Sequence, residues 1–139
     1  MEIGWIGALL AFVAGMIVAM VWYSKGAIAD AWEGLTGITP EKSKPVRTRN
    51  LTLLAVANAV TTVGLAFAVG LTSAATGNDS VWMALVVGAV AWLTLSASTL
   101  LQHNSFEQKP LKLTTINTSY QLALFLVSVA MEKSPLVAM

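Results

Sequence analysis

The distribution of charge along the chain constrains its fold more than any other feature of the sequence. Residues 3–24, 50–78 and 80–106 contain no Asp, Glu, Lys or Arg. Each of these intervals is long enough for the roughly 20 apolar residues that carry an α-helix across a hydrocarbon core of about 30 Å. A fourth uncharged interval, 113–131, is shorter and more polar. The sequence therefore predicts a protein that crosses a lipid bilayer four times.

We expect transmembrane helices at about 3–24, 52–72, 81–102 and 113–131, in a single domain that covers residues 1–139. Composition agrees, because 56% of the residues are hydrophobic and only 11% are charged, against about 25% charged in soluble domains. A removed signal peptide is the alternative reading of the first segment, although its N-terminus carries an acid instead of a basic residue. The predicted fold class is an all-α transmembrane bundle of four helices.

Basic residues predict the orientation of this bundle. Seven of the eight lie in the first and third loops, and they are Lys25, Lys42, Lys44, Arg47, Arg49, Lys109 and Lys112. Loops rich in Lys and Arg stay on the cytoplasmic side of a membrane. We therefore expect a multi-pass protein with both basic loops in the cytoplasm and both termini outside. Trp5, Trp22 and Trp82 lie near predicted helix ends, where interfacial tryptophans are common.

Small residues recur along the first three predicted helices. On the first helix they are Gly7, Ala11, Gly15 and Ala19, one every fourth residue. The second helix has a similar stripe in Asn58, Thr62, Ala66 and Gly70, and the third has Ala84, Gly88 and, beyond Trp92, Ser96. Such stripes let helix backbones approach closely in lipid, where van der Waals contact drives association. We expect packing within one chain, with a homo-oligomer face as the alternative and a packing role for Trp92.

Hydrogen-bonding side chains gather in the halves of the helices that should face the cytoplasm. The outer halves have few such groups, so no continuous polar path of the kind a channel requires is visible. We predict a polar pocket that opens only to the cytoplasm. Its candidate residues are Asn58, Ser98, Thr99, Gln102, His103, Asn117, Tyr120 and Gln121. The alternative is that these side chains only hold the helices together.

The first loop predicts two short helices and a surface that contacts lipid headgroups. Ile28, Ala31, Trp32 and Leu35 share one face of a helix, which is typical of an interfacial helix. A second helix should begin at Thr39-Pro40-Glu41 and end by Pro45. The candidate headgroup and interface residues are Trp22, Trp32, Lys42, Lys44, Arg47 and Arg49. The effect of the basic residues on membrane orientation explains them without any bound lipid, and the sequence alone favours that explanation.

The sequence offers little chemistry. His103 lies four residues before Glu107, a spacing at which the two side chains could share a proton on a helix. A single histidine in a chain without cysteine makes a poor metal site. Nucleotide and phosphate motifs and nucleophile-base pairs are absent. We therefore predict no catalytic residue, no cofactor, no metal and no nucleic-acid partner.

Two blocks of sequence carry a recognisable pattern. The first is Trp22-Tyr23-Ser24, Ala31-Trp32 and Leu35-Thr36-Gly37, and the second is Phe106-Glu107-Gln108-Lys109-Pro110 with Lys112, Ile116-Asn117 and Tyr120. The chain resembles, over nearly its whole length, a family of small bacterial membrane proteins known only as a domain of unknown function. It departs from the family pattern at Leu111 and Gln121, where aromatic residues are common, and at Lys25, where proline is expected. The resemblance implies four helices and a bacterial inner membrane, and it brings no established activity.

The functional hypothesis that follows is a non-enzymatic membrane protein that associates with lipid, with a second copy or with another membrane protein. Its partners would meet the small-residue faces and the cytoplasmic pocket. A small oligomeric transporter or channel subunit is the alternative. A third hypothesis, an enzyme that acts on lipid headgroups, would use His103 and Glu107.

Overall fold

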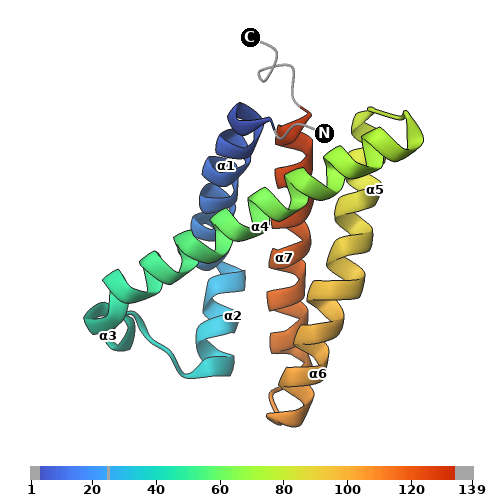
Figure 1. Ribbon diagram of the computed structural model, residues 1–139. Helices are drawn as coiled ribbons and strands as arrows, with labels where there is room; N and C mark the ends of the chain where they lie inside the picture. Colours follow the sequence, from blue (N-terminus) through green and yellow to red (C-terminus); the bar gives the residue numbers. More distant parts are fainter. Residues whose placement is uncertain (1–3, 25, 134–139) are drawn as a thin grey trace.

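The computed structural model describes residues 4–24 and 26–133, which form helices joined by short turns (Figure 1). Four helical segments in this part of the chain are long and apolar enough to cross a membrane. They are α1 (Trp5–Ser24), α4 (Arg47–Thr76) with the short helices that precede it, the continuous segment Val81–Phe106, and α7 (Leu111–Glu132). The predicted all-α bundle of four transmembrane helices is confirmed.

The helices extend beyond the apolar intervals that predicted them. The second was expected at 52–72, but α4 has 30 residues and is about 45 Å long at 1.5 Å per residue. The third runs on to Phe106, and the fourth includes Leu111 and Glu132 at its ends. A hydrocarbon core fixes only the apolar length, so polar flanks can continue a helix into the headgroup region. Helix α4 crosses its neighbours obliquely (Figure 1), as helices longer than the bilayer thickness often do.

Helix α1 packs against α7 and α4 through its small residues. Gly7, Ala11, Gly15 and Ala19 are all buried, so the stripe predicted from the sequence faces the inside of this chain. The tightest point is Gly15, where a β-carbon would lie 2.7 Å from both Asn58 Oδ1 and Leu124 Cδ1. Packing within one chain is confirmed, and this stripe is not available as a face for a second copy.

Helices α4, α5 (Val81–Ala91) and α7 meet toward the end of the bundle where α4 joins α5. Leu65, Val69, Ala84 and Val129 form a buried apolar cluster there. The small residue Gly88 allows close approach, because a β-carbon at this position would lie 3.0 Å from the side chain of Val129. Helices α4 and α5 are therefore packed closely at this end of the molecule.

The helix that starts as α5 changes its winding halfway. Residues Trp92–Ala97 form a π-helical segment, η2, before the α-helical winding resumes in α6 (Ser98–Phe106). Trp92 is half-buried, and its indole Nε1 donates a hydrogen bond of 2.7 Å to the carbonyl oxygen of Thr118 on α7. The packing role predicted for Trp92 is confirmed.

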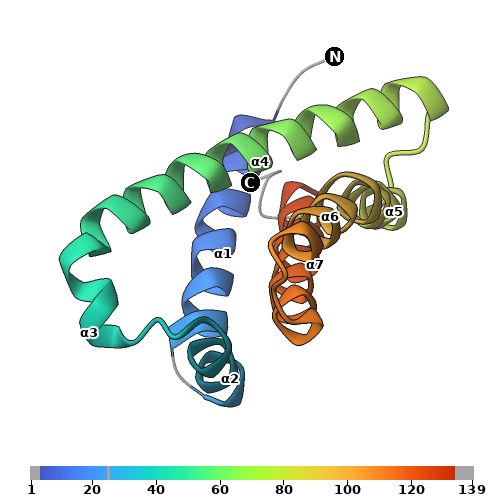
Figure 2. The ribbon, with the colours of Figure 1, turned by 90° about the horizontal axis from the view of Figure 1, so that it is seen from below.

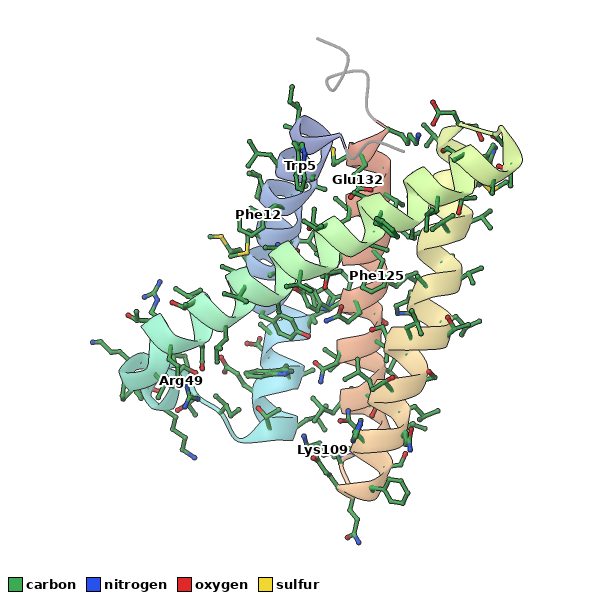
Figure 3. All side chains as sticks on the ribbon, viewed as in Figure 1. Trp5, Phe12, Arg49, Lys109, Phe125 and Glu132 are labelled. Atoms are coloured by element: carbon green, nitrogen blue, oxygen red, sulfur yellow. The ribbon has the colours of Figure 1, made fainter. Side chains whose placement is uncertain are left out.

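The two ends of the bundle differ in charge. Arg49 and Lys109, from the first and third loops, lie at the same end, whereas Trp5 and Glu132 lie at the opposite end (Figure 3). Both basic loops are therefore on one side of the molecule, as the sequence predicts. Which side of a membrane this is remains a prediction of the positive-inside rule.

The first loop contains α2 (Ala27–Thr36), α3 (Pro40–Ser43) and a 3₁₀ turn, η1 (Lys44–Val46). Thr39 caps α3 by accepting a hydrogen bond of 3.3 Å from the backbone N–H of Lys42, and α3 ends before Pro45, as predicted. Helix α2 contains the predicted amphipathic residues 28–35, but it extends along the bundle instead of across its end, since it is seen end-on in Figure 2. It contacts both α1 and α7. Packing of the Trp32 ring against Tyr23 holds α2 in this position.

Candidate functional site

An aromatic cluster joins α1, α2 and α7 at the basic end of the bundle. The hydroxyl of Tyr23 donates a hydrogen bond of 2.8 Å to Asn117 Oδ1. The ring of Tyr23 makes edge-to-face contacts with Trp32, at a centroid distance of 5.6 Å, and with Tyr120, at 5.1 Å. Such pairs add specific geometry to the burial of aromatic surface. Four residues from three helices are thereby fixed against one another.

Two glycines in unusual backbone conformations, one at each end of α2, position this helix beside the cluster. Gly26, immediately before α2, has φ +108°, a value that side chains disfavour, and it allows the chain to turn sharply after α1. Gly37 ends α2 in the left-handed conformation, and its N–H donates to the carbonyl oxygen of Glu33. Between these two turns Ala29 is buried and Trp32 is half-buried. The aromatic side chain expected at headgroup depth is therefore partly covered by Tyr23.

A cavity of about 480 Å³, which we call the basic cavity, lies beside the cluster. The ends of α1, α2, α3 and α4 surround it, and its lining residues are Tyr23, Ser24, Trp32, Glu33, Ile38, Thr39, Pro40, Ser43, Lys44 and Arg47. Lys44 and Arg47 are exposed, whereas Trp32 and Glu33 are half-buried. The cavity thus combines an aromatic wall, two cationic side chains and one carboxylate.

A second cavity, of about 420 Å³, lies on the other side of α2. Trp32 and Ile38 line both cavities, while Lys109, Pro110 and Asn117 line only the second. Helix α2 therefore separates a cavity next to α3 and α4 from a cavity next to the loop before α7. Every wall of these two cavities comes from the end of the bundle that carries the basic loops.

The loop before α7 has its own ion pair. Lys109 Nζ lies 2.7 Å from Glu107 Oε2, and this hydrogen bond lowers the pKa of the Glu107 carboxyl below its usual value. His103 is exposed and makes only a minor electrostatic contribution to that shift. Glu107 is thus engaged by the lysine that follows it in the sequence and not by the histidine one helical turn before it.

The structure does not bring the eight predicted pocket residues into one cavity. Asn58 is buried against α1, where its Nδ2 donates a hydrogen bond of 3.1 Å to the carbonyl oxygen of Phe12. Asn117 and Tyr120 belong to the aromatic cluster, and Thr99 and Gln121 line a groove between α4 and α6. Ser98, Gln102 and His103 are exposed. The prediction treated residues at one depth as neighbours, but these residues point in different directions around their helices.

The residues predicted to contact lipid headgroups also lie at different places in the structure. Trp32, Lys44 and Arg47 line the basic cavity. Lys42 Nζ donates a hydrogen bond of 3.1 Å to the carbonyl oxygen of Gly37, and the Arg49 guanidinium contacts Asn50 Oδ1 at 3.3 Å. Trp22 is half-buried, and its indole N–H has no hydrogen-bond partner in the part of the chain that the structure describes.

Two polar features of the structure were not predicted. Asn104 Nδ2 donates a hydrogen bond of 3.0 Å to Thr114 Oγ1 in a buried pair that joins α6 to α7. At the opposite end, both carboxylate oxygens of Glu132 are buried without a partner among the described residues, beside a cavity of about 80 Å³. A sequence signal existed for the first pair, since Asn104 follows two polar residues. Glu132 was placed just beyond the fourth span.

Comparison with known proteins adds a family and no characterised relative. Neither the curated proteins nor the solved structures contain a match to this chain. A family model described as "Protein of unknown function (DUF1761)" matches residues 6–131. This range contains the aromatic cluster and both cavities, so the resemblance inferred from residues 22–37 and 106–120 is confirmed. The chain belongs to this family of proteins of unknown function.

Proposed function

We propose that this protein is a non-enzymatic membrane protein of the bacterial inner membrane that holds an anionic lipid headgroup in the basic cavity. The carrying observation is the lining of that cavity, where Lys44 and Arg47 face the aromatic wall formed by Tyr23 and Trp32. Cationic side chains attract phosphate groups, and aromatic rings with polar edges suit the headgroup region. The positive-inside rule puts this end in the cytoplasm and both termini outside.

The cavity favours a headgroup over a soluble anion because it lies where bilayer and water meet. Its walls contain apolar residues, such as Ile38 and Pro40, beside the two cations. A phosphate diester could approach Lys44 and Arg47 while the glycerol backbone contacts the aromatic wall. Glu33 also lines the cavity, and its carboxylate would accept hydrogen bonds from hydroxyl groups on the headgroup. Phosphatidylglycerol has both the phosphate and the hydroxyl groups that this arrangement calls for.

Association with a second copy or with another membrane protein is a separate part of the hypothesis. The small residues of α1 are used inside the chain, so an oligomer would have to use other surfaces. We therefore assign the principal role to lipid, and we expect any protein partner to contact the exposed faces of α4 or α6.

The test compares two double variants with equal loss of charge. Lys44→Gln with Arg47→Gln removes the cations of the basic cavity, whereas Lys42→Gln with Arg49→Gln removes two cations of the same loop that do not line it. Native mass spectrometry of protein extracted in mild detergent would count retained phosphatidylglycerol and phosphatidylcholine. Both variants lose the diffuse attraction of about 1 kcal/mol for each basic residue. The first variant also loses two direct hydrogen bonds of about 1.5 kcal/mol each, so it should bind phosphatidylglycerol roughly 150-fold more weakly than the second.

The matched pair also shows how the proposal would fail. Equal losses in both variants would mean that a diffuse surface charge attracts the lipid and that the cavity has no special role. Equal retention of phosphatidylcholine and phosphatidylglycerol by the unmodified protein would contradict recognition of an anion. Turnover of either lipid during incubation would contradict the non-enzymatic assignment.

A further inference from the structure

A groove of about 520 Å³ lies between α4 and the π-helical region, with α7 as its floor. It is distinct from the basic cavity. Its lining residues are Thr61, Gly64, Leu65, Ala68, Ala91, Leu95, Ser96, Thr99, Leu100, Gln121 and Phe125. Phe125 lies in the middle of the molecule, between the two ends marked by Lys109 and Glu132 (Figure 3). We call this feature the midplane groove, because its residues come from the central turns of three membrane-spanning segments.

Two features of the chain keep the midplane groove open. Small side chains line it on both sides, and Gly64 on α4 is exposed, so that a β-carbon there would meet no atom within 4 Å. On the facing helix, η2 widens the winding next to Ala91 and Ser96. The hydrogen bond from Trp92 to the Thr118 carbonyl holds this helix on α7 and away from α4. π-Helical turns often occur at functional sites.

The lining contains hydrogen-bonding groups but no charge. Thr61, Ser96, Thr99 and Gln121 contribute them from α4, η2, α6 and α7. Thr99 donates its hydroxyl hydrogen to the carbonyl oxygen of Leu95. The half-buried amide of Gln121 makes no such bond to another described residue, so its N–H groups remain free to donate into the groove. The groove therefore offers an apolar slot with an unpaired donor at mid-bilayer depth.

We propose that the midplane groove binds an uncharged, membrane-dissolved molecule that carries carbonyl oxygens, of the quinone class, with one carbonyl accepting a hydrogen bond from the Gln121 amide. A charged headgroup is excluded at this depth by the cost of its desolvation. A simple acyl chain would leave the amide without an acceptor. The volume lies within the 300–1,000 Å³ that is usual for small-molecule sites. No redox step is part of this proposal.

The experiment uses the full chain in phosphatidylcholine nanodiscs and a decyl-substituted benzoquinone as the probe. Bound quinone is measured by its absorbance after the nanodiscs are separated from free probe. Gly64→Leu should fill the groove, since a β-carbon at this position has open space, and abolish saturable binding. Gln121→Leu should weaken binding about tenfold, the loss expected for one buried hydrogen bond. Gly34→Leu is the matched control, because that helical glycine also has open space and lies outside the groove.

A second probe, decylbenzene, has the same chain but no carbonyl oxygen. The proposal requires decylbenzene to bind the unmodified protein more weakly than the quinone does. The two probes should bind the Gln121→Leu variant equally. Equal binding of the two probes, or quinone binding that survives Gly64→Leu, would overturn the proposal. A change from dimer to monomer in Gly64→Leu, without saturable quinone binding by the unmodified protein, would identify the occupant as a second copy and also overturn it. Quinone binding should persist in the variant that lacks Lys44 and Arg47, so the two proposals fail independently.

Discussion

The two sides of α4 differ in how closely they approach their neighbours. On the side of α1, Asn58 and Thr62 are 2% and 1% exposed, and the backbone of α1 comes so close that Gly15 has no room for a side chain. On the side of α6, Gly64 borders open space. Both sides carry small and hydroxyl-bearing residues. Composition of a helix face therefore does not decide whether the face is packed or open.

The geometry of the partner helix makes the difference. Helix α1 presents glycine and alanine at four-residue intervals and follows α7 closely. The facing helix at the groove is interrupted by η2, and its Trp92 is held by α7 instead of reaching α4. Small residues on both helices let the backbones approach closely in lipid. Both sides of α4 meet this condition, but on the α6 side the π-helical segment interrupts the facing helix.

The largest loss of stability should come from adding a side chain at the contact between α1 and α4. We expect Gly15→Ala to lower the free energy of unfolding by about 1–3 kcal/mol, because the added carbon would overlap Asn58 and Leu124. Gly64→Ala, on the open side, should be neutral or stabilise the protein by about 0.5–1 kcal/mol through helix propensity. Thermal unfolding in a mild detergent would measure both. Similar losses in the two variants would mean that the two sides of α4 are packed alike.

A smaller effect is expected at Gly88, where α5 meets α7 before η2 begins. A β-carbon there would lie 3.0 Å from Val129 Cγ2, which is a less severe overlap than the 2.7 Å contacts at Gly15. We expect Gly88→Ala to cost about 1 kcal/mol, between the values for the other two glycines. The same unfolding assay tests this order. A cost above that of Gly15→Ala would show that α5, and not α1, makes the tightest contact in the bundle.

The hydrogen bond between Tyr23 and Asn117 joins α1 to α7 at the basic end of the bundle. Tyr23→Phe removes the hydroxyl and keeps the ring contacts with Trp32 and Tyr120. Side-chain hydrogen bonds between membrane helices average about 0.6 kcal/mol, so we expect a loss of that size in the unfolding assay. Tyr120→Phe is the control, since the Tyr120 contact described above is made by its ring alone. A greater loss in the control would contradict this assignment.

The sequence predicted the spans and the α1 stripe because each depends on a simple periodic requirement. A bilayer demands a stretch of apolar residues, and a helix brings Gly7, Ala11, Gly15 and Ala19 onto one face. The functional site needed more, namely the rotational position of each helix. Tyr120 and Gln121 are neighbours in sequence, yet one contacts Tyr23 and the other lines the midplane groove.

The turn at η2 was not predictable either. A π-helical segment shifts the direction of every side chain that follows it, and residues 92–97 contain no proline or glycine that would signal a break in the winding. Four of the predicted pocket residues follow this segment in α6, and all four are exposed: Ser98, Thr99, Gln102 and His103. Helix α2 shows the same limit, since its amphipathic pattern predicted a helix but not that Trp32 would pack on Tyr23.

The smallest effect concerns the end opposite the basic loops, where the turn between α4 and α5 is tied to α7. Asp79 in this turn pairs with Lys133 and accepts a hydrogen bond of 3.1 Å from Ser73 Oγ. The hydrogen bonds from Lys133 and Ser73 lower the pKa of the exposed Asp79 carboxyl below its usual value. A carboxyl with a lowered pKa in the folded state stabilises the fold above its unfolded pKa, and this contribution disappears as the pH falls through the folded value.

We therefore expect the unfolding temperature of the unmodified protein to fall slightly more than that of Asp79→Asn as the pH is lowered below about 4. The difference should also shrink in 1 M salt, because exposed ion pairs are screened. The matched comparison is Glu107→Gln, which removes the exposed carboxyl that pairs with Lys109 at the basic end. Its pKa is also lowered, so the same pH trend is expected in that variant. If the α4–α5 turn is held only by the apolar cluster around Val69 and Ala84, Asp79→Asn will follow the unmodified protein at every pH. The contact between α4 and α5 would then depend on packing alone, whereas the contact between α4 and α1 also contains the hydrogen bond from Asn58 to the Phe12 carbonyl.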